Sequence, residues 1–248
     1  SVQNYPLGTK LVYGDNVYRY SKSGAAIQSG LVVQAAAITE GDIAVQAAVT
    51  AADTTISVTT TATTAANQYD EGYLLITQNA DQAARVGGSY RIKSHESGGS
   101  GTIVFTLYDA INVALSTSSK VTIIANRYSG VITAAATPTA ELVGISLPVQ
   151  DVNNTVTSAY YFWLQTSGIA AVVCADVSGL DTIGQSAYVK AGSTAGNVYA
   201  INAGASSAVG TTITDTILND NYLVGTVIDA PGGADSDCVV LRLTLPTV

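Results

Sequence analysis

The chain has 248 residues, of which 47% are hydrophobic and only 11% are charged, and its formal net charge is −8. Soluble domains usually carry about a quarter charged residues, so this composition favours β-structure with flat, weakly charged surfaces. The net negative charge repels phosphate, and the ten lysines and arginines are scattered, which argues against nucleic acid as a partner. No apolar run approaches the ~18 residues of a membrane span, so we expect no membrane partner.

The N-terminal residues predict an arm followed by a hairpin. Residues 1–9 are polar and do not have the pattern of a signal peptide, so we expect an extended N-terminal arm and synthesis in a cytoplasm. Lys10–Tyr13 and Val17–Tyr20 flank the turn residues Gly14, Asp15 and Asn16, as in a β-hairpin.

The middle of the chain shows the clearest period-2 pattern. Tyr90 and Ile92 are expected on one face of a strand, and Arg91 and Lys93 on the other. The residues 103, 105 and 107 alternate in the same way with their neighbours. Asp109–Ser116 is the best helical candidate, with Asp109 as a possible N-cap.

Further strands are expected in the C-terminal half, with turn residues between them. Tyr160–Gln165 and Ile169–Ala175 are predicted as two strands joined by a turn at residues 166–168. Strand spacings of about 8–12 residues are typical of β-sandwiches and barrels. The sequence therefore predicts an all-β fold of sandwich-like or barrel-like domains with an extended N-terminal arm. We divide it into an arm and hairpin (1–38), a middle β-module (39–130) and a C-terminal β-domain (131–248). We expect the middle module to be separate, with residues 1–38 returning to pair with residues 131–248.

No catalytic constellation is recognisable, and we expect the protein not to be an enzyme. His95 is the only histidine, and its neighbours Ser94 and Glu96 point to the opposite face of a strand. A general base needs a nucleophile and an orienting group. We therefore expect His95 to be a polar residue at the rim of a loop, whose replacement by alanine changes stability by less than about 0.5 kcal/mol.

Neither cofactors nor metals are expected. Cys174 and Cys238 lie in apolar runs, and we favour two reduced, buried thiols over a disulfide because a core of this size needs no staple. The acidic pairs Asp235 with Asp237 and Asp70 with Glu71 offer too few oxygens for calcium, which takes six to eight ligands. We interpret them as solvated turn carboxylates.

Two aromatic features are candidate partner contacts. In the run from Tyr160 to Trp163, alternation places Tyr161 and Trp163 on one face of a strand, either in the core or in an interface. In the arm, Pro6 favours an extended conformation at Tyr5, so the Tyr5 ring is able to anchor on a partner, with Leu7 following it.

Several segments, taken in order, resemble tailed-bacteriophage head proteins of the decoration (cement) kind, which are often encoded beside the major capsid protein. The segments that carry the resemblance are Gly8–Gly24, Gly88–His95, Thr102–Leu115, Val121–Ile132, Tyr160–Val173 and Tyr222–Ala230. The resemblance implies a β-rich fold, a place in an icosahedral virion and no catalysis.

From this resemblance we expect a capsid decoration protein that binds the major capsid protein and stabilises the head. We further expect a homo-oligomer, a trimer, on the outer capsid surface, with the arm Ser1–Leu7 reaching a neighbouring subunit. The chain would be made in the host cytoplasm and end in the virion. The alternative is a phage tail-fibre or other β-rich adhesin that binds carbohydrate through the Tyr161 and Trp163 face.

Overall fold

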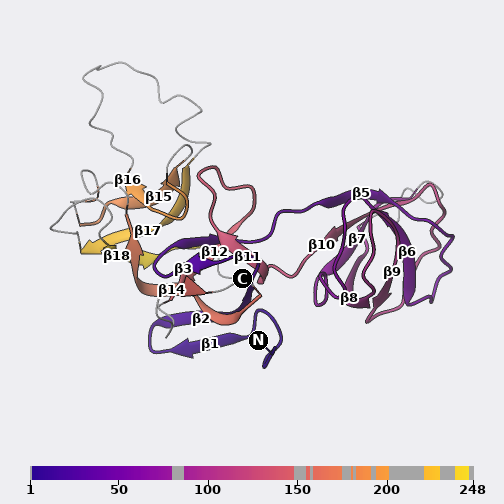
Figure 1. The fold of residues 1–248 in the computed structure, drawn as a ribbon, viewed down its shortest axis with the longest axis horizontal. Helices are drawn as coiled ribbons and strands as arrows, with labels where there is room; N and C mark the ends of the chain where they lie inside the picture. The colour runs from indigo at the N-terminus through magenta and orange to yellow at the C-terminus, as the bar shows by residue number, and fades with distance from the viewer. Residues whose placement is uncertain are drawn as a thin grey trace, which may run out of the picture. The chain divides into compact units, whose positions relative to one another are not determined.

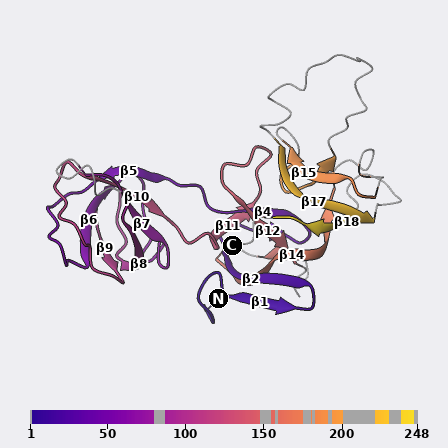
Figure 2. The same cartoon turned by 180° about the vertical axis from the view of Figure 1, so that it is seen from behind.

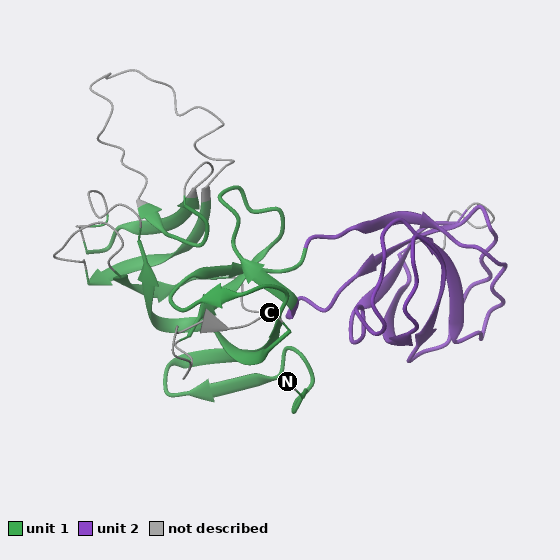
Figure 3. Cartoon of the chain, in the orientation of Figure 1, with its two compact units in different colours: residues 1–36, 130–248 green, residues 37–129 purple. Residues whose placement is uncertain are grey.

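Two compact β-units make up the chain. The computed structural model describes residues 2–79, 87–147, 155–156, 159–174, 180, 183–190, 194–200, 221–229 and 238–245. Every regular element in these ranges is a β-strand, which confirms the all-β prediction. The outer unit comprises residues 1–36 and 130–248, and the inserted unit comprises residues 37–129 (Figure 3).

The inserted unit starts two residues before, and ends one residue before, the middle module expected from the sequence (37–129 against 39–130). Residues 1–36 and 130–248 belong to one unit, which agrees with the expected return of residues 1–38 to pair with residues 131–248. Its two halves are joined by strand pairing, because a strand near residue 20 pairs with one near residue 163.

In its described residues the outer unit contains one ten-stranded sheet and a small two-stranded one. The sheet order is β1-β2-β11-β4-β12-β14-β18-β17-β15-β16, and β3 pairs with β13. The bounds of these strands are β1 Lys10–Tyr13, β2 Asn16–Ser23, β3 Ile27–Gln28, β4 Val32–Gln34, β11 Ser129–Thr133, β12 Leu142–Ser146, β13 Thr155–Val156, β14 Tyr161–Val173, β15 Ser186–Lys190, β16 Tyr199–Ala200, β17 Asn221–Asp229 and β18 Cys238–Leu243.

An additional pairing of β2 with β14 closes five strands of this sheet, β2, β11, β4, β12 and β14, into a barrel (Figure 1). Small barrels fill their interior with side chains. The strands β4, β11, β12 and β14 accordingly carry fully or nearly fully buried apolar residues: Val33, Val131, Val143, Phe162 and Leu164. The strand β1 lies outside this ring, at the end of the sheet.

The long strand β14 links the barrel to the rest of the sheet. The sequence predicts two strands separated by a turn at residues 166–168, but β14 continues through this stretch with a register irregularity between Gln165 and Ser167. Its first half pairs with β2 and its second half with β18. Gly168 has φ +94°, and a Cβ there would collide with Asn16, so the bend of the strand requires glycine.

The inserted unit is a curled six-stranded sheet in the order β5-β10-β7-β8-β9-β6. Its strands are β5 Glu40–Ala44, β6 Thr55–Thr60, β7 Tyr73–Gln78, β8 Ser89–His95, β9 Gly101–Leu107 and β10 Lys120–Ile124. The edge strands β5 and β6 approach each other at a bridge between Val45 and Val58. The unit has its own core, which includes Ile56, Leu74, Ile92, Phe105 and Ile123.

The alternation predicted for this unit is confirmed. Tyr90 and Ile92 are buried whereas Arg91 and Lys93 are exposed, and β9 buries its residues 103, 105 and 107. The short helix considered over Asp109–Ser116 is wrong, because these residues pair with a distant segment instead. Ile111 donates its backbone N–H to the Asp53 carbonyl at 2.8 Å, and Leu115 forms a bridge with Val49.

Candidate functional site

Four aromatic rings of the outer unit gather where β2 and β14 pair; we call Tyr5, Tyr20, Tyr161 and Trp163 the aromatic cluster. Trp163 lies opposite Tyr20 in the register, and Tyr161 lies opposite Lys22. Tyr20 stacks on Tyr161 with ring centroids 5.7 Å apart and meets Trp163 edge-on at 5.2 Å. Such pairs contribute about 0.5–1.5 kcal/mol beyond their buried area.

The N-terminal arm folds back over this cluster. The Tyr5 ring lies 5.3 Å from Tyr20, edge-on, and 5.8 Å from Trp163. The Asn4 backbone N–H donates to the Tyr20 hydroxyl at 3.1 Å, and the Tyr161 hydroxyl donates to Gln3 at 3.3 Å. Within the single chain, therefore, the arm contacts its own β2 and β14.

A turn after Tyr5 redirects the arm. The Thr9 backbone N–H and hydroxyl both donate to the Pro6 carbonyl, at 3.1 and 2.6 Å, and the Gly8 N–H donates to the Tyr20 carbonyl at 2.8 Å. Pro6 is exposed and Leu7 is half-buried. The arm thus ends in a tight turn over residues 6–9, which leads the chain into β1.

The question whether Tyr161 and Trp163 belong to the core or to a surface has a structural answer. Phe162, on the opposite face of β14, is buried in the outer unit, while Tyr161 and Trp163 are only half-buried. Tyr5 is 51% exposed, and the Lys22 ammonium lies 5.7 Å from the Tyr161 ring centroid. The cluster is therefore a partly wet aromatic surface with one cation beside it.

The structure brings all five residues predicted as partner contacts into one region, and it adds residues that the sequence did not single out. The chief addition is Tyr20, which is almost fully buried at the centre of the cluster. Its importance depends on the pairing of β2 with β14, across more than a hundred residues of sequence. The local alternation of residues in β2 does not indicate which distant strand it pairs with.

The strand β1 forms the second part of this surface. All four of its residues are exposed, including Leu11, Val12 and Tyr13. Both views draw β1 as the outermost strand of its sheet, next to β2 (Figures 1 and 2). Edge strands are normally protected by charge, proline or bulges, yet Lys10 is the only charged residue of β1.

His95 lies in the core of the inserted unit, and the prediction of a loop-rim residue is wrong. Its Nε2 accepts a hydrogen bond from the Tyr69 backbone N–H at 2.9 Å, and its Nδ1 donates to the Glu96 carbonyl at 2.9 Å. The ring packs on Phe105 with centroids 4.7 Å apart. Burial lowers the pKa of His95 below its ordinary value, although the bond to Glu96 opposes this shift. Both ring nitrogens are used, so His95 has a structural role.

Glu40 is likewise buried and bonded within the inserted unit. Its carboxylate accepts the Thr61 backbone N–H at 2.8 Å, the Thr61 hydroxyl at 3.1 Å and the Ala62 backbone N–H at 3.1 Å. A buried carboxylate needs such donors. Glu40 therefore ties the segment after β6 to β5.

The cysteines are thiols, but they differ in exposure. Cys174 is buried in the core of the outer unit, as predicted, whereas Cys238 is exposed, which contradicts the prediction of two buried thiols. Cys238 lies opposite Val173, the residue before Cys174. Successive residues of a strand face opposite sides, so the two sulfur atoms point to different faces of the sheet.

Two acidic pairs were predicted to be solvated turn carboxylates. Asp235 and Asp237 lie outside the described residues. In the ranges that the structure does describe, Asp70 and Glu71 included, no three His, Cys, Asp or Glu side chains gather as they would around a metal ion.

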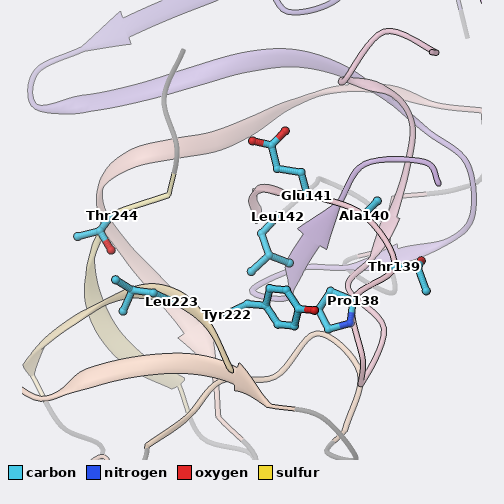
Figure 4. Close-up of a pocket in the computed structure, with 8 residues that line it drawn as sticks. All are labelled: Pro138, Thr139, Ala140, Glu141, Leu142, Tyr222, Leu223 and Thr244. Carbon is cyan, nitrogen blue, oxygen red and sulfur yellow. The ribbon is translucent and has the colours of Figure 1, made fainter. Parts of the chain in front are cut away.

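A pocket of about 600 Å³ lies between β12 and β17 in the outer unit (Figure 4). It is lined by Pro138, Thr139, Ala140, Glu141, Leu142, Tyr222, Leu223 and Thr244. The Glu141 carboxylate points away from the Tyr222 ring (Figure 4). A carboxylate without a second catalytic group beside it does not define a reaction.

Comparisons of the chain with protein-family models, curated protein sequences and solved structures give no match. The part of the chain that the structure describes contains no helix of the length and apolarity needed to cross a lipid bilayer. The candidate site is the surface formed by the aromatic cluster, the arm and β1, which presents partly exposed rings and aliphatic side chains.

Proposed function

We propose that the protein is a virion structural protein, a decoration or cement protein that binds the major capsid protein and stabilises the phage head without catalysing a reaction. The observation that carries the proposal is the contact surface formed by the arm, the aromatic cluster and β1. This surface offers exposed rings and apolar side chains. Tyrosine and tryptophan are the residues on which protein interfaces chiefly depend.

Because a capsid repeats the same binding site many times, a modest contact surface is enough for attachment. A decoration protein binds a lattice in which every contact recurs, so several weak contacts of one oligomer add up through their high effective concentration. Low surface charge suits such broad contacts, and the chain has 11% charged residues. The proposed place is the outer capsid surface, reached after synthesis in the host cytoplasm, with neither nucleic acid nor membrane as a partner.

The test is cosedimentation of the protein with purified capsid shells. Full-length protein is expected to pellet with shells, and a variant lacking residues 1–7 is expected to bind them much more weakly. Tyr5→Ala should reproduce most of that loss, because Tyr5 is the ring that the arm presents. The matched control is Tyr108→Ala, which removes a tyrosine of similar exposure from the inserted unit. Absence of binding by the full-length protein would sink the proposal.

The second candidate is a tail-fibre or other adhesin that binds carbohydrate. The half-buried rings of Tyr161 and Trp163 favour it, because sugars stack on aromatic faces, and the nearby Lys22 and Gln3 supply polar groups. Binding to a glycan panel that is lost in Trp163→Ala, together with no binding to shells, would put this candidate first.

A further inference from the structure

The outer edge of β1 is open for pairing in the described chain. β1 ends the sheet order, with β2 on its inner side. Its exposed residues Leu11, Val12 and Tyr13 are 43%, 56% and 78% accessible to solvent. An edge of this kind is a template for a further strand.

The hydrogen bonds of the hairpin show which main-chain groups of β1 point outward. The Tyr20 N–H donates to the Thr9 carbonyl at 3.0 Å, so Thr9 directs its carbonyl inward, towards β2. In an antiparallel pair inward and outward residues alternate. Leu11 and Tyr13 therefore also bond to β2, opposite Tyr18 and Asn16, and Lys10 and Val12 direct their N–H and C=O groups out of the sheet.

We propose that β1 pairs with β1 of a second copy of this chain, antiparallel and around a two-fold axis at Val12. The two Val12 residues then exchange both of their outward hydrogen bonds. Leu11 of each copy lies opposite Tyr13 of the other, on one face of the extended sheet. The contact is isologous, since the same strand serves both partners.

The apolar pattern selects this register among those that the outward groups allow. A two-fold axis at Leu11 would place Lys10 against Val12 and Tyr13 against Thr9. An axis at Tyr13 would place Val12 against Gly14 of the turn. Only the axis at Val12 covers all three exposed apolar side chains of β1 with apolar partners, and cross-strand pairs of this kind stabilise sheets.

Charge supports a second copy as the occupant. With the axis at Val12, Lys10 of each copy lies opposite Gly14 of the other, beside the carboxylate-bearing turn residue Asp15. Opposite charges therefore meet at both ends of the paired strands, and the two Lys10 ammonium groups stay apart.

The contact is small, and its strength follows from its size. A pair of four-residue strands buries less than the ~1,000 Å² of a stable complex. We therefore expect weak dimerisation in solution, which becomes important where copies are held close together. The pairing needs no capsid, so it stands or falls separately from the proposed function.

Cross-linking tests the register directly, in a Cys238→Ser background that removes the exposed native thiol. Leu11 and the second copy's Tyr13 form a pair without mutual hydrogen bonds, at the Cα separation of ~4.5 Å that a disulfide can bridge. A mixture of Leu11→Cys and Tyr13→Cys chains should oxidise to the mixed dimer, whereas Leu11→Cys alone should give little. The control Val104→Cys, exposed on the inserted unit, should also give little. Equal yields in all three samples would overturn the proposal.

A second measurement uses the outward N–H of Val12. Val12→Pro removes that donor without removing a hydrogen bond to β2, and proline is tolerated on edge strands. Sedimentation of concentrated wild-type protein should show a dimer that Val12→Pro abolishes while the melting temperature is kept. A trimer, or any assembly unchanged by Val12→Pro, would contradict β1 pairing.

Discussion

His95 illustrates how one irregularity in a strand overrides sequence alternation. Counting alternate residues from the buried Tyr90 and Ile92 puts His95 on the exposed face of β8. The register of β8 shifts between Ile92 and Ser94, so that His95 lies opposite the buried Phe105. The extra residue of a β-bulge reverses the faces beyond it, and neither composition nor alternation announces where a bulge occurs.

Replacing His95 by alanine is therefore expected to destabilise the inserted unit. The change leaves the Tyr69 N–H and the Glu96 carbonyl without partners and creates a cavity, which together cost about 2–4 kcal/mol. Unfolding in urea, followed by far-ultraviolet circular dichroism, measures the loss. Lys93→Ala, on the exposed face of the same strand, is the control and should change stability by less than about 0.5 kcal/mol. An equally small effect of His95→Ala would contradict the buried position.

The lowered pKa of His95 also makes stability depend on pH. The folded state binds the proton less readily than the unfolded state, whose histidine titrates near its ordinary value of 6.5. The unfolded state thus carries more protons as the pH falls below that value, so stability declines from there down to the folded pKa. The difference in unfolding free energy between the wild type and His95→Gln should bend in this interval. A flat difference between pH 8 and pH 5 would exclude the effect.

The two cysteines are expected to react at very different rates. A thiol reagent should modify Cys238 quickly in the folded protein, and Cys174 only after denaturation, because one thiol is exposed and the other buried. Titration of folded and denatured samples gives the number of reactive thiols in each state. The substitution Cys238→Ser should remove only the fast-reacting thiol. Two slow groups in the wild type would mean that another chain or segment covers Cys238.

At the scale of elements, the strands were predictable and their partners were not. Hydrophobic alternation locates β8, β9 and β10, because each has one buried and one exposed face. The pairing of β2 with β14 depends on residues far apart in sequence, which leave no local pattern. The continuity of β14 was not predictable either. Gly168 is a typical turn residue, but here it allows a bend within one strand.

The arm shows the same limit, since Tyr5 was predicted as a contact residue but its contact within the chain was not. Removal of residues 1–7 should expose Trp163, on which the Tyr5 ring packs. Trp163 is the only tryptophan, so all tryptophan fluorescence of the protein comes from this site. Quenching by acrylamide should increase in the truncated protein, while the melting temperature changes little. Unchanged quenching would show that the arm does not cover Trp163 in solution.

At the scale of the whole molecule, each unit has its own core, so each is expected to fold independently. The buried residues of the inserted unit form one cluster, and the strands of the outer unit hold another. Residues 37–129 expressed alone should unfold in one cooperative transition, as small single domains usually do. The complementary sample is the outer unit with residues 37–129 replaced by a short Gly/Ser linker, and it should also fold. An unfolded 37–129 fragment would show that it depends on the rest of the chain.

The way the inserted unit joins the outer one has a mechanical consequence. The chain enters the inserted unit just after β4 and leaves it at the start of β11. These two strands are paired, with Gln34 opposite Ile132. A tensile load applied to the two ends of the chain therefore passes from β4 to β11 through hydrogen bonds of the outer unit. As long as that pairing holds, residues 37–129 bear no tension, and a load that strains the outer unit leaves the inserted one unstretched.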